Sequence, residues 1–302
     1  MSRLLVITNP SAGGDEAALN TALDVLRAGA DVEVAETSSP DELDDVLATR
    51  DGRTVVVAGG DGSLHAVVAA LHRCGDLAES VVGLVPLGTG NDFARGTGVP
   101  LEPDEAARAV LDGTPQPTDI LVADDGEVVV NHVHMGISAD AGRKGADVKS
   151  VLGKFGLGKL GYPIGALRAA LRPQVTRVRV EVDGREVNPA QRAVLMVSVG
   201  IGPDVGGGTT LTPDARPDDG RADVMVSRAI GVWARIGYAV RLGRGEHTER
   251  ADVLTVRGRS IALRGEEFFT SADGELGGPY RERTWTVMPA AYRLLRRPSD
   301  RP

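Results

Sequence analysis

The sequence predicts two domains of different class: a three-layer α/β domain with a parallel sheet at residues 1–118, and an antiparallel β-sandwich domain at residues 119–288. The chain of 302 residues is longer than one compact core usually needs. Strand and helix patterns alternate in the first third, whereas strand patterns follow one another with few helices after it. The tail at 289–302 could return to the first domain.

The first domain is expected to consist of repeated strand–helix units. Short apolar runs, typical of strands buried on both faces, occur at residues 4–7, 55–57 and 81–85, and Val32 with Val34 marks another strand. Helical spacing follows at 15–28, at 39–49 after a capping box, and from Gly62 to Leu71. Such units imply a parallel sheet with helices on both faces, and these sheets bind ligands at the carboxyl ends of their strands.

The second domain is expected to be mostly antiparallel strands separated by turns such as Asp183-Gly184. The expected strands lie at residues 120–122, 128–130, 175–182, 193–199, 222–226, 253–256 and 285–287. Residues 158–171 and 230–242 have helical spacing and are expected to connect or cover these strands.

Composition narrows the class of partner. The net charge is -8 and aromatic residues make up only 3% of the chain, which argues against nucleic acid as a partner, whether bound by charge or by stacking.

No apolar run approaches the ~20 residues that a membrane span needs, and no secretory signal is visible. The single cysteine, Cys74, excludes an intramolecular disulfide, fits the cytoplasm and is expected in the core.

Glycine-rich polar loops follow three of the expected strands. They lie at residues 9–14 (NPSAGG), 59–63 (GGDGS) and 86–95 (PLGTGNDFAR). Glycines let the backbone approach phosphates, and a following helix N-terminus offers free N–H groups. A carboxylate at Asp61 would repel phosphate unless Mg²⁺ lay between them, and Asn91 is placed to cap the next short helix. Together the loops predict a phosphate-binding crevice.

These three segments resemble the N-terminal motifs of the diacylglycerol kinase catalytic-domain family, which includes bacterial lipid kinases and is related to sphingosine and ceramide kinases. Further similarity covers nearly the whole chain. It includes Asp119 in PTDILVA, residues 131–141 (NHVHMGISADA), residues 217–224 (PDDGRADV) and residues 272–275 (ADGE). The resemblance implies an NAD kinase/diacylglycerol kinase-like fold, and an ATP-dependent kinase that phosphorylates a lipid hydroxyl, with diacylglycerol giving phosphatidic acid.

The resemblance also implies roles for individual residues. Glu275 would be the general base, Asp119 would orient the nucleophile or the metal, and Asp61 would serve the nucleotide and its Mg²⁺. The implied ATP-binding residues are Asn9, Thr37, Gly59, Gly60, Asp61, Gly62, Ser63, Gly88, Thr89, Gly90 and Asn91. A structural Mg²⁺ held in some bacterial members would bind at Arg216, Asp219 and Arg221, with the arginines contributing carbonyl oxygens.

One window of the acidic chain is basic. The four lysines of the chain and three arginines lie within 143–172, where the only acid is Asp147, so the window carries a local charge of +6. Each basic residue near an anionic surface contributes roughly 1 kcal/mol. We therefore expect transient contact of this segment with a membrane surface, although a solvated linker explains the composition equally well. The family also makes a homodimer possible.

Several alternatives stay open. The acceptor could be phosphatidylglycerol, a sphingoid base, NAD or a soluble polyol, and the chain could be a regulatory protein that binds nucleotide without turnover. The retention of Asp61, Asp119 and Glu275 argues against the regulatory protein, and a first loop without G-x-G-x-x-G argues against a dinucleotide-dependent oxidoreductase. Of His132 and His134, one is expected to be exposed and the other satisfied in a cleft.

Overall fold

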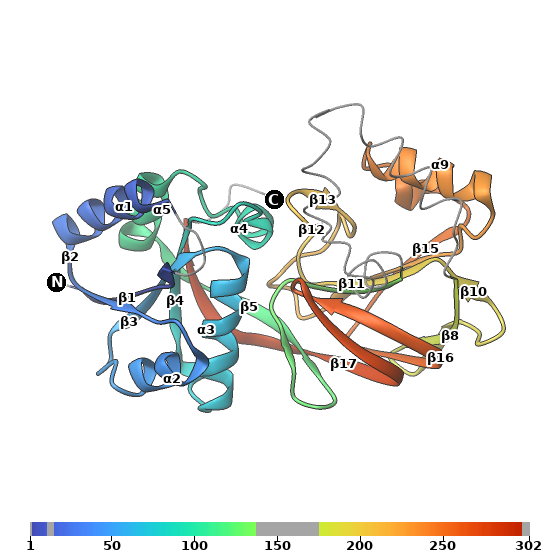
Figure 1. Ribbon diagram of the computed structural model, residues 1–302, viewed down its shortest axis with the longest axis horizontal. Helices are drawn as coiled ribbons and strands as arrows, with labels where there is room; N and C mark the ends of the chain where they lie inside the picture. The colour runs from blue at the N-terminus through green and yellow to red at the C-terminus, as the bar shows by residue number, and fades with distance from the viewer. Residues whose placement is uncertain (1, 11–14, 137–174, 298–302) are drawn as a thin grey trace.

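A computed structural model describes residues 2–10, 15–136 and 175–297. The first domain contains β1 (Ser2–Thr8), α1 (Glu16–Gly29), β2 (Ala30–Glu36), α2 (Pro40–Ala48), β3 (Thr54–Gly59), α3 (Asp61–Arg73), η2 (Leu77–Glu79), β4 (Val81–Pro86), α4 (Asp92–Thr97) and α5 (Pro103–Asp112). Strands β2, β1, β3 and β4 are adjacent and parallel, as predicted. Helices α1 and α5 cover one face of this sheet, and α2 and α3 cover the other (Figure 1).

The remaining elements form the antiparallel β-sandwich region that the sequence predicted. They are β5 (Thr114–Ala123), β6 (Val128–Val129), β7 (His132–Gly136), β8 (Thr176–Val182), β9 (Arg185–Asn188), β10 (Ala193–Val194), β11 (Met196–Gly200), β12 (Asp204–Val205), β13 (Thr209–Thr210), β14 (Ala222–Ser227), α9 (Val232–Leu242), η3 (His247–Glu249), β15 (Val253–Gly258), β16 (Ser260–Ala272) and β17 (Glu275–Arg296). The helix expected at 230–242 is α9. The helix expected at 158–171 lies outside the described residues.

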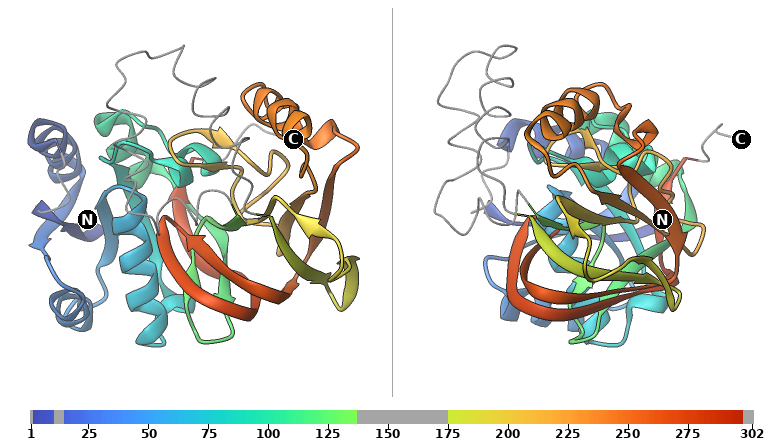
Figure 2. Two further views of the ribbon diagram at one scale, coloured as in Figure 1. Left: turned by 45° about the vertical axis from the view of Figure 1, so that its right-hand side comes forward. Right: turned by 90° about the vertical axis from the view of Figure 1, so that its right-hand side faces the viewer.

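Strand β17 joins the two halves into one continuous sheet. It runs for 22 residues, pairs with β16 along its first part and with β5 along its second, and pairs in parallel with β4 at Arg293 and Leu294. The orange-red ribbon can be followed from one half to the other (Figures 1 and 2). The sequence pattern indicated only three residues of this strand, because its exposed first half carries glycines and charges. The proposed boundary between 118 and 119 falls within β5.

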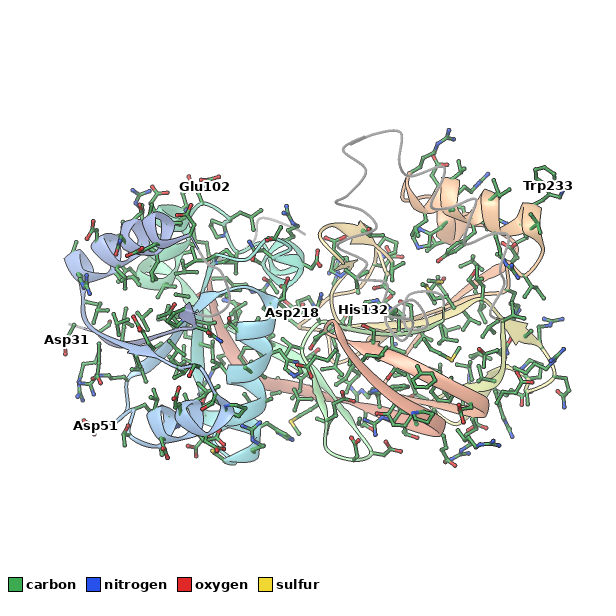
Figure 3. All side chains as sticks on the ribbon, viewed as in Figure 1. Asp31, Asp51, Glu102, His132, Asp218 and Trp233 are labelled. Carbon is green, nitrogen blue, oxygen red and sulfur yellow. The ribbon has the colours of Figure 1, made fainter. Side chains whose placement is uncertain are left out.

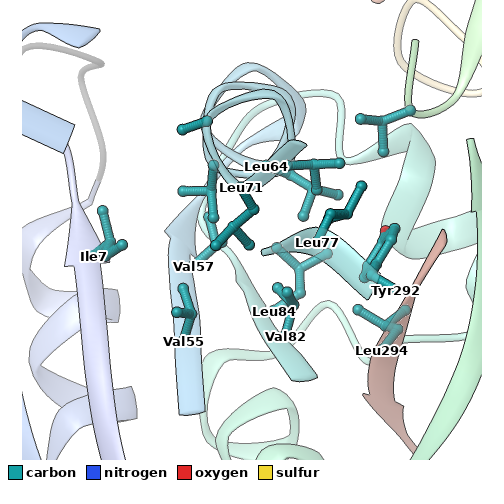
Figure 4. Close-up of a cluster of buried hydrophobic side chains, with 14 of the residues drawn as sticks. Ile7, Val55, Val57, Leu64, Leu71, Leu77, Val82, Leu84, Tyr292 and Leu294 are labelled. Carbon is teal, nitrogen blue, oxygen red and sulfur yellow. The ribbon is translucent and has the colours of Figure 1, made fainter. Parts of the chain in front are cut away.

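The end of β17 contributes to the core of the first domain. Tyr292 and Leu294 are fully buried and belong to the same apolar cluster as Val57, Leu64 and Leu84 (Figure 4). That cluster fills the space between the sheet and the helices α2 and α3. The chain therefore cannot complete its first core until its last strand is in place.

Replacing Leu294 with alanine should destabilise the first domain. The side chain is fully buried, so the expected loss is about 2–5 kcal/mol in the free energy of unfolding. The neighbouring Arg293 is exposed, and Arg293→Ala should change stability by less than ~0.5 kcal/mol. Urea unfolding of both variants measures the difference; equal midpoints would show that β17 is not part of this core.

Candidate functional site

The second and third glycine-rich loops touch one another. They leave adjacent parallel strands, where Gly59 of β3 lies opposite Pro86 of β4, and Leu87 N–H donates to the Gly59 carbonyl at 3.0 Å. A Cβ added to Gly88 would lie 2.6 Å from the Gly60 Cα, so neither loop has room for a side chain at the contact. A small crevice beside them is lined by Gly59, Gly60, Asp61, Leu64, Leu84, Pro86, Asn91 and Ala94.

Asp61 holds the third loop in place. It is the first residue of α3, and its two carboxylate oxygens accept hydrogen bonds from the N–H groups of Asp92 and Phe93, each at 3.0 Å. The carboxylate therefore satisfies the N-terminus of α4, the helix that follows the GTGN segment. Burial raises the pKa of Asp61 despite these hydrogen bonds, and the neighbouring charges of Asp92 and Asp273 raise it further.

The capping role expected of Asn91 is wrong. Its backbone is left-handed, with φ of 51°, and its side chain makes no cap hydrogen bond to α4. Instead, Asn91 Oδ1 accepts from Gly88 N–H at 3.0 Å and its amide donates to the Gly88 carbonyl at 2.7 Å. Asn91 thus closes the loop on itself, because the carboxylate of Asp61 already occupies the helix end.

Asp92 is a site residue that the sequence analysis missed. Its carboxylate accepts hydrogen bonds from Gly207 N–H at 2.9 Å and from Gly208 N–H at 2.7 Å. These glycines form the turn between β12 and β13 in the second domain. The signal available in the sequence was the triple glycine at 206–208, whose backbones all have positive φ. The link attaches the second domain to the third glycine-rich loop of the first, residues 86–95.

Asp273, which had been assigned no role, accepts hydrogen bonds within the second domain and contacts the first domain through His65. Its carboxylate accepts from the backbone N–H groups of Val130, Asn131 and His132 at 2.6–3.0 Å and contacts His65 Nδ1 at 2.9 Å. His65 lies on α3, one turn after Asp61. Burial lowers the pKa of His65, but the hydrogen bond and charge of Asp273 outweigh it and raise that pKa above its ordinary value.

Glu275 lies two residues after this link, and its side chain is exposed. Asp273 and Gly274 form the tight turn between β16 and β17, and Ala272 pairs with Glu275 across it. The turn requires positive φ at both central residues, 47° at Asp273 and 94° at Gly274. The geometry therefore anchors the turn through Asp273 and leaves Glu275 available to solvent.

Asp119 is buried and does not share the exposure of Glu275. Its oxygens accept hydrogen bonds from the N–H groups of Gly220 at 2.6 Å and Ala290 at 2.7 Å, and its own N–H donates to the Pro217 carbonyl. Burial raises the pKa of Asp119, and the two hydrogen bonds lower it in part. In the structure this carboxylate therefore fixes the loop at 217–220 against β17.

The residues of the predicted ion site, Arg216, Asp219 and Arg221, are exposed and lie on or directly beside that loop. One Asp219 oxygen accepts from Arg221 N–H at 3.1 Å, and the other pairs with the guanidinium of Arg257. An ion bound there would have to compete with this guanidinium. Among the described residues, no three His, Cys, Asp or Glu side chains are grouped to hold a metal ion. The site stays a prediction.

The other predicted ATP-binding residues lie at the ends of the parallel strands. Asn9 follows β1, and Thr37 follows β2 with its N–H donating to the Thr8 carbonyl at 2.9 Å. Ser63 Oγ would be 2.5 Å from a Cβ on Gly59, so the hydroxyl lies over that glycine. Thr89 and Gly62 are exposed, and Gly90 lies between the carboxylates of Asp61 and Asp92.

The expected exposure of one β7 histidine and the expected burial of Cys74 are both wrong. Neither histidine of β7 is exposed: His132 is buried with its Nε2 2.9 Å from Ser198 Oγ, and His134 is half-buried. Burial lowers the pKa of both histidines, that of His134 to about 4, so both are neutral at pH 7. Figure 3 places His132 and Asp218 near the middle of the molecule, where the domains meet. Cys74 is exposed because it lies just beyond the end of α3.

Comparison with known proteins agrees with this arrangement. Residues 3–123 match the diacylglycerol kinase catalytic domain, and residues 131–296 match the YegS C-terminal NAD kinase beta sandwich-like domain. A diacylglycerol kinase of Bacillus subtilis is 31% identical over 76% of this chain and 74% of its own length. A probable lipid kinase YegS-like of Pseudomonas aeruginosa is 33% identical over 80% of this chain and 76% of its own length.

A crystal structure of a diacylglycerol kinase from Bacillus anthracis has the same fold. It superposes with a TM-score of 0.74 and covers 98% of both chains at 23% identity. The fold, the glycine-rich loops and these relatives define a phosphotransferase whose acceptor is an alcohol group. The chain belongs to the diacylglycerol kinase family of lipid kinases.

Replacing Gly88 with alanine should distort the contact between the two loops. The new Cβ would meet the backbone of Gly60 at 2.6 Å, so one loop must move, at a cost of about 1–3 kcal/mol, and ATP affinity should fall with it. Gly231→Ala is the control, since its Cβ would meet no atom closer than 4.0 Å. Calorimetric titration with ATP compares the two; equal affinities would exclude these loops from the ATP site.

The contact between His65 and Asp273 should make stability depend on pH. The folded-state pKa of His65 is raised, so its contribution is full below the ordinary value of 6.5 and is lost as pH rises through the folded value. His65→Gln cannot titrate. The difference in urea midpoint between the wild type and this variant should therefore be largest in mild acid and shrink in mild alkali. A difference that does not change with pH would contradict a charged link.

Proposed function

We propose that this protein transfers the γ-phosphoryl group of ATP to the hydroxyl of a membrane lipid, with diacylglycerol as acceptor and phosphatidic acid as product. The observation that carries the proposal is the position of Glu275. Glu275 is an exposed carboxylate beside the β16–β17 turn. Asp273 in that turn contacts His65 on α3, the helix that begins at the glycine-rich loop at 59–63. The relatives named diacylglycerol kinase support the choice of acceptor.

In this proposal, the first domain, residues 1–118 with the tail at 289–302, binds ATP. The triphosphate would lie over the contact of Gly60 and Gly88, where the absence of side chains lets phosphate oxygens approach backbone N–H groups. Asn9, Thr37, Ser63 and Thr89 would surround it from the neighbouring loops, as the family resemblance implies. The Mg²⁺ that accompanies ATP would offset the negative charge of the phosphates, which the carboxylates of Asp61 and Asp92 would otherwise repel.

The second domain, residues 119–288, would present the lipid and the base. The lipid hydroxyl would lose its proton to Glu275 as its oxygen bonds to the γ-phosphorus, and ADP would leave from the opposite side with the electrons of the broken bond. The buried Asp119 would act at a distance from this step, by holding the loop at 217–220 and the backbone of Ala290.

The names of the relatives favour a lipid acceptor over NAD or a soluble polyol, since these proteins are called diacylglycerol kinase or probable lipid kinase. Phosphatidylglycerol and sphingoid bases present a hydroxyl as diacylglycerol does, so the assay must separate these lipids.

The conservative variant Glu275→Gln tests the base. It should lower kcat by about 10²–10⁴ while leaving ATP binding intact, because the amide keeps the shape but cannot accept the proton. Radiolabelled ATP with a total lipid extract identifies the phosphorylated lipid by chromatography. Glu267→Gln, an exposed glutamate elsewhere on β16, is the control. Labelling at full rate by Glu275→Gln would refute the assignment, and a labelled soluble product would refute the lipid acceptor.

A further inference from the structure

The exposed apolar side chains of the described residues are concentrated on one helix. Six large hydrophobic residues are exposed, and four of them lie at the start of α9 or along it: Ile230, Val232, Trp233 and Val240. Trp233 is 83% exposed, whereas the other tryptophan, Trp285, is 1% exposed. Figure 3 shows Trp233 projecting from the end of α9 away from the β-sheet.

The opposite face of α9 is packed. Tyr238 is buried in a cluster with Leu195, Met196 and Met225, so the helix is held to the sheet by one side and presents the other outward. A soluble protein gains from covering such residues, and exposed apolar patches mark sites of contact with partners or membranes. None of the described residues covers this face.

The charge around the exposed face favours an anionic partner. From Ala229 to Gly245 the chain contains three arginines, of which Arg235 is buried, and no acidic residue, although the protein as a whole carries a net charge of -8. Arg244 is exposed, and Arg241 is 43% exposed although it lies 3.6 Å from Glu249. The nearest acids in sequence, Glu246 and Glu249, follow the C-terminal end of α9, while Trp233 lies in its first turn.

Tryptophan, aliphatic residues and arginine on one face are the combination that lipid interfaces favour. Indole rings settle at the headgroup level, where one part of the ring is apolar and the N–H stays hydrated. Arginines beside them interact with anionic headgroups. Helix α9 also lies on the same side of the molecule as α4 and the β12–β13 turn, which contacts Asp92 at the start of α4 (Figures 1 and 2).

We propose that the outer face of α9, formed by Ile230, Val232, Trp233 and Val240 with Arg241 and Arg244, docks on an anionic lipid bilayer. The proposal rests on the proposed function, since an acceptor dissolved in a bilayer requires the enzyme to reach it. The basic segment at 143–172, which was expected to contact a membrane surface, lies outside the described residues.

The two tryptophans make the contact directly measurable. Trp285 is already buried, so a blue shift of emission on adding vesicles would report Trp233 alone. We expect the shift with vesicles of phosphatidylcholine and phosphatidylserine, and a smaller one with phosphatidylcholine only. In co-sedimentation, Trp233→Ala should weaken binding about tenfold or more. Arg244→Gln should weaken it several-fold on anionic vesicles only.

Met288→Ala is the matched control, since Met288 is 37% exposed but lies on β17, away from α9. Its binding should equal that of the wild type. Vesicle binding by Trp233→Ala as tight as the wild type's, or emission that vesicles do not change, would overturn the proposal. An emission shift that follows protein concentration without vesicles would instead assign the face to a second copy of the chain, and would also overturn it.

Activity assays separate this proposal from the proposed function. Trp233→Ala should keep the wild-type rate on a short-chain diacylglycerol dissolved in water and lose rate on the same acceptor in vesicles. If the wild type phosphorylates lipid in solution and binds vesicles without Trp233, the docking face is wrong and the kinase assignment stands. If vesicle binding requires Trp233 but no lipid is phosphorylated, the kinase assignment is wrong and the docking face stands.

Discussion

The geometry of the candidate site depends on the contacts of the Asp273 carboxylate. This carboxylate accepts three backbone N–H groups at the start of β7 and contacts the imidazole of His65 on α3. A carboxylate buried this deeply is tolerable only with such a full set of donors. Because the donors come from both domains, the contact fixes the position of the β16–β17 turn relative to the glycine-rich loops, and with it the position of Glu275.

The same principle recurs at the other acidic residues of the motifs. Asp61, Asp92 and Asp119 each accept backbone N–H groups from a segment distant in the sequence. Asp61 thereby holds the start of α4, Asp92 the turn between β12 and β13, and Asp119 the loop at 217–220. Glu275 differs, because its side chain is exposed. Of the three acids expected to take part in catalysis, Asp61 and Asp119 hold backbone segments and only Glu275 has an exposed side chain.

Strand β17 extends this coupling to the whole chain. Since it belongs to the antiparallel sheet at one end and lies next to β4 at the other, a change in the angle between the domains must bend this strand. The links through Asp92 and Asp273 oppose the same movement. The arrangement favours a site whose geometry is set before ligands bind, which reduces the entropy lost in positioning the acceptor hydroxyl.

The sequence by itself determined the fold class, most strands of both domains and the glycine-rich loops, because these follow from local periodicity and from backbone positions that only glycine fills. It also marked Glu275, through the family resemblance. Only the tertiary structure decided the partners of Asp61, Asn91, Asp92 and Asp273, the burial of His132 and the length of β17. Those outcomes depend on contacts between residues far apart in the chain, and no local pattern carries information about which distant N–H group a buried carboxylate will meet.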